Sequence, residues 1–198
     1  KKGLVYSRLA RRLRSLGLKN FKDYCALLDT QEGENEESHL LSALTTNVTH
    51  FFRERHHFDQ LRQDILPDLV ARARSGACVR LWSSACSAGQ EAYCMAAMVL
   101  DACSDAKSLD IKVLATDVDP AIIEKARAGV YPDDQLEAIP AAYGGLMVDR
   151  NAGLAGYFAM RPELRALVSF GQLNLIGEWP MKRKFDVIFC RNAAIYFD

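Results

Sequence analysis

The 198-residue sequence lacks long apolar runs, although 49% of its residues are hydrophobic. All of its apolar stretches are short, so the sequence predicts no transmembrane helix. No charged start followed by an apolar segment and a cleavage site marks a signal peptide. The hydrophobic content and a charged content of 25% are those of ordinary globular proteins. We therefore expect a cytoplasmic protein that does not insert directly into a membrane.

The sequence also lacks the residue spacings that bind metals. It has six cysteines but no Cys-x-x-Cys pair, which disfavours both a zinc site and a disulfide framework. Most of the cysteines stand among apolar residues, so we expect buried, reduced thiols. The adjacent His56 and His57 would diverge by about 100° on a helix, and no HExxH pattern surrounds them. The sequence predicts no metal site.

The charges of the chain sum to zero but are unevenly distributed. Residues 1–30 carry eight Lys and Arg against two Asp, and four glutamates follow within residues 32–37. Residues 4–16 predict an amphipathic helix with leucines on one side and four arginines on the other: Arg8, Arg11, Arg12 and Arg14. This basic face indicates either a docking surface for an acidic partner or a solvated helix face. The remainder of the chain is not basic, so we expect no nucleic-acid binding.

The pattern of apolar residues changes along the chain from helical to alternating helix and strand. Short helices are predicted at 4–16, at 20–29 and up to residue 44, with a polar loop at 33–37. A longer helical pattern over 56–74 contains Pro67, which predicts a kink or a break. Strand–helix alternation then predicts a parallel, doubly wound α/β sheet of Rossmann-like type. Its strands are expected at 79–82, 111–116, 168–175 and 185–190, its helices at 91–102 and 120–128, and an irregular insertion at 131–165.

Two domains follow from this pattern. We predict an N-terminal helical domain with its linker over residues 1–52, and a Rossmann-like domain over residues 53–198. The sequence stops directly after the fourth predicted strand, where a doubly wound sheet usually continues. We therefore expect the second domain to be incomplete at its C-terminus in this sequence.

The loop after the first strand indicates which ligand the sheet binds. In open α/β sheets the ligand lies outside the carboxyl ends of the strands. Residues 83–91 contain one glycine, Gly89, and no lysine, so neither a GxGxxG fingerprint nor a P-loop is present. Such a loop disfavours a dehydrogenase and suits an adenosine without phosphates, as in S-adenosylmethionine. Asp117, at the second strand end, would accept hydrogen bonds from the ribose hydroxyls, and Glu91 could reach the amino-acid end of the cofactor.

Several polar residues near the strand ends allow more than one interpretation. Asp117 could be a solvated loop acid, although its position at a strand end favours a function. Asp119 precedes Pro120 and is predicted to cap the following helix. Asn174 follows the third strand and is either a turn residue or a contact on the adenine side of the cofactor.

Residues 45–53 combine an amide, three hydroxyls and a guanidinium with two adjacent phenylalanines. One interpretation is a segment over a small-molecule pocket, with Phe51 and Phe52 packed in the core and the polar groups turned to the ligand. The other interpretation is an N-capped helix start, with Thr45, Thr46 or Asn47 as the cap.

Long motifs resemble those of the CheR-type chemotaxis receptor methyltransferases and cover nearly the whole chain in the family's order. The chain departs from the family at residues 89–94, where GQEAYC replaces the usual GEEPYS; Glu91 is retained. The matching stretches are LTTNVTHFFRE (44–54), RLWSSACSAGQEAY (80–93), LATDVD (114–119), KARAGVYP (125–132), FGQLNL (170–175) and FDVIFCRNAAIYFD (185–198).

This resemblance implies a helical domain packed on an S-adenosylmethionine domain that methylates glutamate side chains of chemoreceptors, with S-adenosylhomocysteine as the product. It implies that Arg53 and Tyr196 stand nearest the reacting methyl group. It also makes the cytoplasmic domain of a chemoreceptor the partner that the basic N-terminal helix could dock. By matching position, the cofactor site would be lined by Asn47, Thr49, Arg53, Ala85, Glu91, Asp117, Asn174, Leu175 and Asn192.

Two alternatives stay open at the level of the sequence. One is a regulatory protein that binds S-adenosylmethionine or S-adenosylhomocysteine without methylating receptors. The other is a methyltransferase for small molecules or nucleic acids. Residues 191–194 (RNAA) stand where amino-group methyltransferases carry an Asn/Asp-Pro-Pro-Tyr/Phe motif, which disfavours that chemistry.

Overall fold

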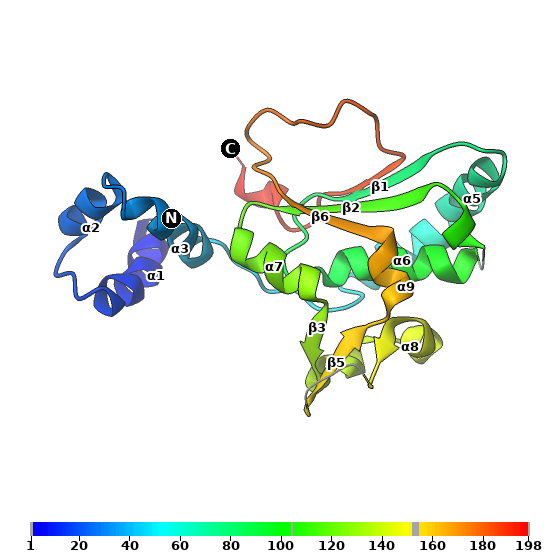
Figure 1. The fold of residues 1–198 in the computed structure, drawn as a ribbon, viewed down its shortest axis with the longest axis horizontal. Coiled ribbons are helices and arrows are strands. Elements are labelled where there is room, and N and C mark those ends of the chain that lie inside the picture. The colour runs from blue at the N-terminus through cyan, green and yellow to red at the C-terminus, as the bar shows by residue number, and fades with distance from the viewer. Residues whose placement is uncertain (1, 104, 152–154, 198) are drawn as a thin grey trace.

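A computed structural model describes residues 2–103, 105–151 and 155–197. Figure 1 shows a helical domain at one end of the molecule, connected by a linker to a larger α/β domain. The helical domain contains α1 (Lys2–Ser15), α2 (Phe21–Leu28) and α3 (Gly33–Leu44). Leu9 and Leu13 of α1 pack with Tyr24 of α2 in a small core of their own. The helical start of the chain is therefore as predicted.

The polar stretch at 33–37 is not a loop, as the sequence suggested, but the beginning of α3. The glutamates of this stretch lie near the N-terminus of α3, where negative side chains stabilise a helix through its dipole. Glu36 is buried, and its carboxylate accepts hydrogen bonds from Arg12 Nε at 2.7 Å, Arg12 Nη2 at 2.6 Å and the Tyr24 hydroxyl at 2.9 Å. The Arg12 guanidinium lowers the pKa of Glu36, while burial and Glu36 raise the pKa of Tyr24 to about 12. Glu36 of α3 therefore joins its helix to both α1 and α2.

The large domain is built on a parallel sheet with strand order β6-β2-β1-β7. The parallel α/β prediction is therefore correct, although the third and fourth strands are shorter than expected. The strands are β1 (Val79–Ser83), β2 (Ile111–Asp117), β6 (Val168–Gln172) and β7 (Val187–Phe189).

Helices lie on one face of this sheet in the described residues. Figure 1 shows α6 (Gln90–Ala102), α7 (Pro120–Ala128) and α9 (Pro162–Leu167) below the strands and the connection 173–186 above them. Trp82 of β1 faces that connection, with ring centroids 4.9 Å from Trp179 and 5.0 Å from Phe185. In the described residues, this connection covers the second face of the sheet.

The helical pattern before β1 is interrupted, as Pro67 predicted. α4 (Arg55–Gln60) continues into a π-helical turn, η1 (Leu61–Ile65), and then into α5 (Leu66–Arg74). Proline has no backbone N–H and its ring clashes with the carbonyl four residues earlier, so the preceding turn widens. The helix is therefore interrupted by a π-helical turn, and no loop separates α4 from α5.

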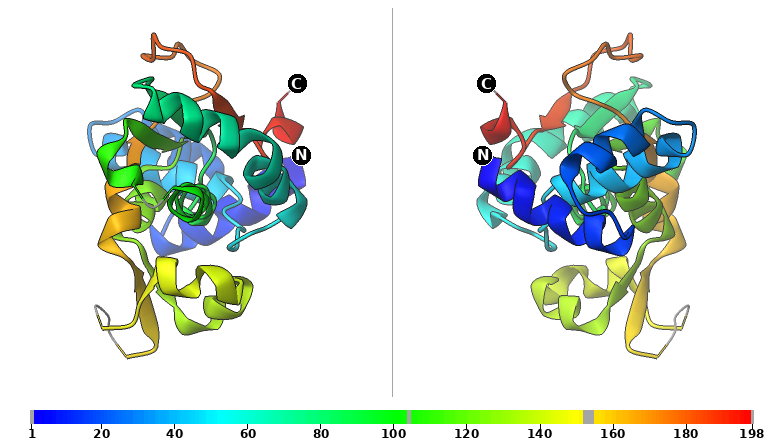
Figure 2. Two further views of the ribbon diagram at one scale, coloured as in Figure 1. Left: turned by 90° about the vertical axis from the view of Figure 1, so that its right-hand side faces the viewer. Right: turned by 90° about the vertical axis from the view of Figure 1, so that its left-hand side faces the viewer.

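The segment between α7 and β6 is an ordered subdomain, not the irregular insertion that was predicted. Its antiparallel sheet has the order β3-β5-β4. Figure 2 shows this sheet and its helix projecting away from the parallel sheet. The subdomain contains β3 (Val130–Pro132), α8 (Ala141–Met147), β4 (Val148–Asp149) and β5 (Tyr157–Met160). Short 3₁₀ turns are found at η2 (Ala106–Ser108), η3 (Asp133–Ala138) and η4 (Ala194–Tyr196).

The six cysteines are free, and only three of them are buried: Cys86, Cys94 and Cys103. The expectation that most would be buried is therefore half right. Across the described ranges, no cluster of three or more metal-ligating side chains is present. In the same residues, no helix combines the length and the apolar character that crossing a membrane requires.

Candidate functional site

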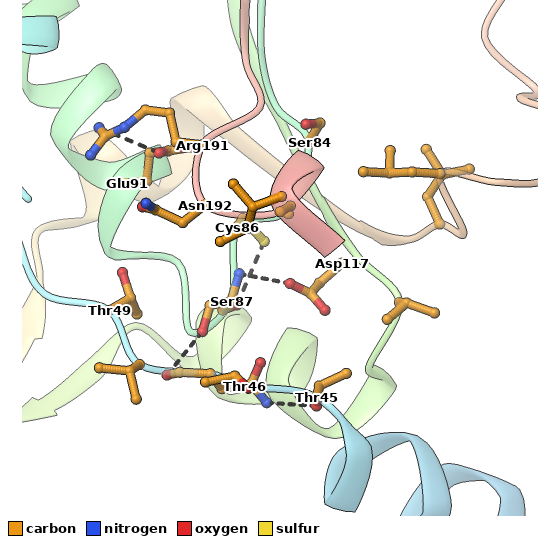
Figure 3. Close-up of a pocket in the computed structure, with 18 of the residues that line it drawn as sticks. Thr45, Thr46, Thr49, Ser84, Cys86, Ser87, Glu91, Asp117, Arg191 and Asn192 are labelled. Carbon is orange, nitrogen blue, oxygen red and sulfur yellow. Dashed lines mark hydrogen bonds and ion pairs between the residues drawn. The ribbon is translucent and has the colours of Figure 1, made fainter. Parts of the chain in front are cut away.

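A cavity of about 620 Å³ lies where the carboxyl ends of the four parallel strands meet the linker from α3. Its volume lies within the range of small-molecule sites. Segments 84–87, 117–118, 173–176 and 191–197 follow the strands and contribute to its wall, and Figure 3 shows several of these residues. Arg8 of α1 and linker residues from Thr45 to Arg53 form the opposite wall. The cavity is thus at the sheet edge where the sequence predicts ligand binding.

The structure brings all nine predicted cofactor-binding residues to this one cavity. Arg53, also predicted to be catalytic, is among them. The side chain of Tyr196 lies outside the described part of the structure, and its neighbours Ile195 and Phe197 line the cavity. The roles of these residues stay predictions; the nine are Asn47, Thr49, Arg53, Ala85, Glu91, Asp117, Asn174, Leu175 and Asn192.

The loop after β1 needs its single glycine for packing. Gly89 has a φ of 92°, and a Cβ at this position would stand 2.9 Å from the Cβ of Ala126 on α7. Only glycine adopts this conformation at this close approach without strain. The glycine therefore lets α6 begin against α7.

Asp117 is a buried carboxylate at the end of β2. Its Oδ2 accepts a hydrogen bond from the backbone N–H of Ser87 at 2.9 Å, and its Oδ1 accepts one from the N–H of Asp119 at 3.1 Å. Burial raises the pKa of Asp117, and these backbone donors oppose that rise. Each carboxylate oxygen has a second lone pair, so the group can still accept two hydrogen bonds from a ligand. A ligand with two neighbouring hydroxyl groups could donate one hydrogen bond to each of these carboxylate oxygens.

Glu91, in the first turn of α6, is a second acid in the cavity wall. Its Oε1 accepts a hydrogen bond from the Ser83 hydroxyl at 2.6 Å, and its Oε2 lies 3.4 Å from Arg191 Nη1. Burial raises the pKa of Glu91, while Ser83 and Arg191 oppose the rise. A carboxylate of this kind, in a side chain that is 14% exposed, can bind a cationic group of a ligand.

Arg191 is the main functional candidate that the sequence reasoning missed. Its side chain is only 10% exposed, and its Nε lies 3.5 Å from Oε2 of Glu54. Its guanidinium lies over the rings of Phe58 and Phe189, 5.0 Å and 5.6 Å from their centroids. Asn192 donates to the same Glu54 at 3.1 Å. A charged residue directly after a buried strand, as at Asp117, was the signal that could have identified Arg191.

The linker 45–54 is not a capped helix start. α3 ends at Leu44, and α4 begins at Arg55 after Glu54, whose φ of 54° is left-handed. Phe51 and Phe52 are buried; their ring centroids lie 5.0 Å from those of Tyr131 and Tyr143. The polar linker residues face the cavity instead. The segment therefore has the arrangement of the first interpretation, a wall over a pocket.

Further contacts at the linker fix the position of two cationic side chains, Arg53 and Arg8. Arg53 Nη1 donates to the carbonyl of Val48 at 2.8 Å. Arg8 of α1 donates to the carbonyl of Leu44 and, at 2.5 Å, to the hydroxyl of Thr46. The sequence placed Arg8 on a surface face, whereas the structure places it in the cavity wall.

Asn174 is a turn residue that also lines the cavity, and its contact with the adenine side of the cofactor stays a prediction. Its Oδ1 accepts a hydrogen bond from the N–H of Ile176 at 3.0 Å, as in an Asx turn, and the residue also lines the cavity. Asp119 caps α7 as predicted, accepting from the N–H of Ala121 at 2.9 Å.

Comparison with known proteins relates both parts of the chain to one family. Residues 1–45 match the all-alpha domain of CheR methyltransferases, and residues 47–198 match the CheR methyltransferase SAM binding domain. The chain is 46% identical to a probable chemotaxis protein methyltransferase of Rhizobium etli, covering all of the chain and 74% of that protein. It is 43% identical to chemotaxis protein methyltransferase 2 of Pseudomonas aeruginosa (98% of the chain, 68% of that protein) and 40% identical to the Escherichia coli chemotaxis protein methyltransferase (100% and 67%).

Proposed function

The chain belongs to the CheR methyltransferase family, and from this premise we propose that it methylates glutamate side chains of chemoreceptors with S-adenosylmethionine. The observation that carries the proposal is the single cavity that collects all nine residues implied for the cofactor. The product of the reaction is S-adenosylhomocysteine, which would remain in the same cavity until it is released.

The side chains present fit this cofactor. Asp117 would accept hydrogen bonds from the two ribose hydroxyls through the free lone pairs of its carboxylate. Glu91 would bind the ammonium group at the amino-acid end. The loop between them offers no lysine and no glycine-rich stretch, and a cofactor without phosphates requires neither. When bound, the cofactor supplies an electrophilic methyl group on a sulfonium.

The residues of the chain need to align the substrate and do not need to deprotonate it. A glutamate carboxylate has a reference pKa of about 4.3 and is ionised at neutral pH. Transfer of a methyl group to it is an in-line displacement that requires no strong general base. Catalysis then consists of holding the reacting atoms at about 3–3.5 Å and excluding water.

Arg53 is the proposed positioning group. Its guanidinium lines the cavity and is held on one side by the Val48 carbonyl, which leaves other N–H groups for a carboxylate. That carboxylate belongs either to the substrate or to the cofactor. For Tyr196 we propose, on the resemblance alone, that its ring contacts the sulfonium or that its hydroxyl orients the substrate.

We propose that the exposed arginines of α1 dock the acidic cytoplasmic domain of the receptor. Arg11 and Arg14 are exposed, whereas Arg8 and Arg12 bind the linker and Glu36. Reversing both charges (Arg11→Glu, Arg14→Glu) should slow receptor methylation and weaken its dependence on salt. A matched control reverses two exposed lysines in the 173–186 connection, Lys182 and Lys184. Equal methylation by the two double variants would contradict this docking surface.

The division into domains is part of the same proposal. Residues 1–52 would form the helical domain and its linker, and residues 53–198 the S-adenosylmethionine domain. The separate helical core and the extended linker after α3 support a boundary in this region.

Methyl transfer to a receptor tests the function directly. The protein is incubated with S-adenosylmethionine labelled in its methyl group and with the cytoplasmic fragment of a chemoreceptor. We expect label on the receptor that base releases as methanol, because carboxyl methyl esters are base-labile. A folded protein that binds S-adenosylhomocysteine but leaves receptors unlabelled would contradict the proposal and favour a regulatory cofactor-binding protein.

A further inference from the structure

We propose that Asp119 is a positioning residue that joins the helical domain to the cofactor cavity, and that Ser42 acts on the cavity through it. We call the four residues Ser42, Thr45, Asn47 and Asp119 the Asp119 clasp. The inference rests on the proposed cofactor site and adds to it residues of the helical domain and linker that reach the cavity wall through Asp119.

The carboxylate of Asp119 accepts hydrogen bonds from three side chains that lie on the other side of the proposed domain boundary. The Ser42 hydroxyl of α3 donates to Oδ1 at 2.7 Å, and the Asn47 amide donates to Oδ2 at 3.1 Å. The Thr45 hydroxyl lies 3.4 Å from the same Oδ2. Asp119 itself is 2% exposed, so these are hydrogen bonds to a buried charge. Such bonds are about twice as strong as neutral ones.

The backbone of Asp119 continues the connection into the cofactor site. Its N–H donates to Asp117 Oδ1 at 3.1 Å, and the N–H of Ser87 donates to Asp117 Oδ2 at 2.9 Å. The Ser87 hydroxyl then returns to the carbonyl of Asn47 at 3.3 Å. Figure 3 shows both Ser87 bonds, one to Asp117 and one to the linker. Asn47, Asp119, Asp117 and Ser87 therefore form a closed circuit of hydrogen bonds around one side of the cavity.

Capping of α7 does not account for these contacts. The cap uses only Oδ1, which accepts from the N–H groups of Ala121 and Ile122. Serine or asparagine at this position would cap a helix equally well. Capping of α7 requires neither the hydrogen bonds to Oδ2 nor the long-range hydrogen bond from Ser42, so these contacts indicate a second role for Asp119.

The circuit connects the two walls that a bound cofactor would contact. Asp117 and Ala85 lie on the strand side, and Thr49 and Arg53 lie on the linker side. The separation of these walls depends on the bond between Asn47 and Asp119 and on the anchoring of α3 by Ser42. Cofactor binding should therefore strengthen the clasp, and by reciprocity the clasp should strengthen cofactor binding.

Ser42 allows a clean test because it does not line the cavity. Calorimetric titration with S-adenosylhomocysteine should show about tenfold weaker binding by Ser42→Ala, the effect of one hydrogen bond to a charged group. Ser38→Ala, the same change one turn earlier on α3, should bind like the wild type. Ser42→Thr keeps the hydroxyl and should restore most of the affinity. Thermal unfolding confirms that each variant is folded.

Hydrogen exchange of the linker amides gives a second readout. S-adenosylhomocysteine should slow exchange over residues 45–50 in the wild type, and Ser42→Ala should speed it without ligand. Equal affinity and equal exchange in Ser42→Ala and Ser38→Ala would overturn the clasp. Failure of the folded wild type to bind would instead contradict the proposed cofactor site, and ligand-free exchange alone would then decide the clasp.

Asp119→Ser separates the clasp from the cap. Serine retains capping ability, but its shorter side chain cannot reach Ser42 and Asn47 together. We expect a larger loss of affinity than in Ser42→Ala. Wild-type affinity in this variant would refute the role of Asp119 as a positioning residue.

Discussion

Glu91→Gln removes one negative charge from the cavity while keeping the shape of the side chain. The Glu91 carboxylate lies between the Ser83 hydroxyl at 2.6 Å and Arg191 at 3.4 Å. If it binds the ammonium group of the cofactor, the variant loses a charge-assisted interaction of about 1.5–3 kcal/mol. The dissociation constant for S-adenosylhomocysteine should then rise by roughly 10–100-fold.

The pH dependence of binding gives a sharper test. Burial raises the pKa of Glu91, so the neutral form persists to a higher pH than in an ordinary glutamate. The ligand's ammonium binds the ionised form, and the wild-type affinity should fall as the pH decreases through this raised pKa. Glu91→Gln should lose that part of the dependence. The slope that remains belongs to Asp117, whose pKa burial also raises.

Titration calorimetry at a series of pH values from acid to neutral measures both effects. Glu54→Gln is the matched control because Glu54 contacts the same Arg191, at 3.5 Å, without lining the cavity. Arg191 keeps one acid in either variant, so both proteins should remain folded. Equal losses of affinity in the two variants would show that Arg191, and not the Glu91 charge, determines binding, which would refute this reasoning.

Two further changes test the reaction and the helical domain. Arg53→Ala should lower receptor methylation by about 10²-fold, with a much smaller change in the affinity for S-adenosylhomocysteine, and near-normal turnover would remove Arg53 from the mechanism. Glu36→Gln should lower the free energy of unfolding by about 1–3 kcal/mol, whereas Gln at the exposed Glu37 should not. Arg12 lowers the pKa of Glu36, so this stabilisation is present at neutral pH and is lost as the pH falls through the lowered pKa. Urea unfolding at neutral and acid pH measures it, and an unchanged pH dependence in Glu36→Gln would contradict the assignment.

Local patterns predicted the parts of the fold that local chemistry determines. Asp119 and Pro120 begin α7 where capping rules place a helix start. Pro67 interrupts a helix because of its own ring and missing N–H. Asp117 and Asn192 reach one cavity because the carboxyl ends of parallel strands share an edge. The sheet and much of the candidate site could therefore be inferred from the sequence.

Contacts between distant residues account for what the sequence did not reveal. Residues 33–37 are helical, and Glu36 among them meets Arg12, which is 24 positions away in the chain. The strands at 130–160 pair antiparallel across most of a subdomain, and no local pattern indicated their partners. Arg191 meets Glu54 and Glu91 only after the sheet has formed. Arg8 likewise reaches the cavity only through the packing of α1 on α3.

Titration of the protein with S-adenosylhomocysteine, with Asp117→Ala as the comparison, tests the central claim most directly. The account predicts micromolar binding by the wild type that is lost in the variant. Asp117 is the buried carboxylate in the cavity wall that two backbone N–H groups hold in place and that would accept hydrogen bonds from the ribose hydroxyls. Absence of binding by the folded wild type, or equal binding by the two proteins, would contradict the assignment of this cavity to S-adenosylmethionine.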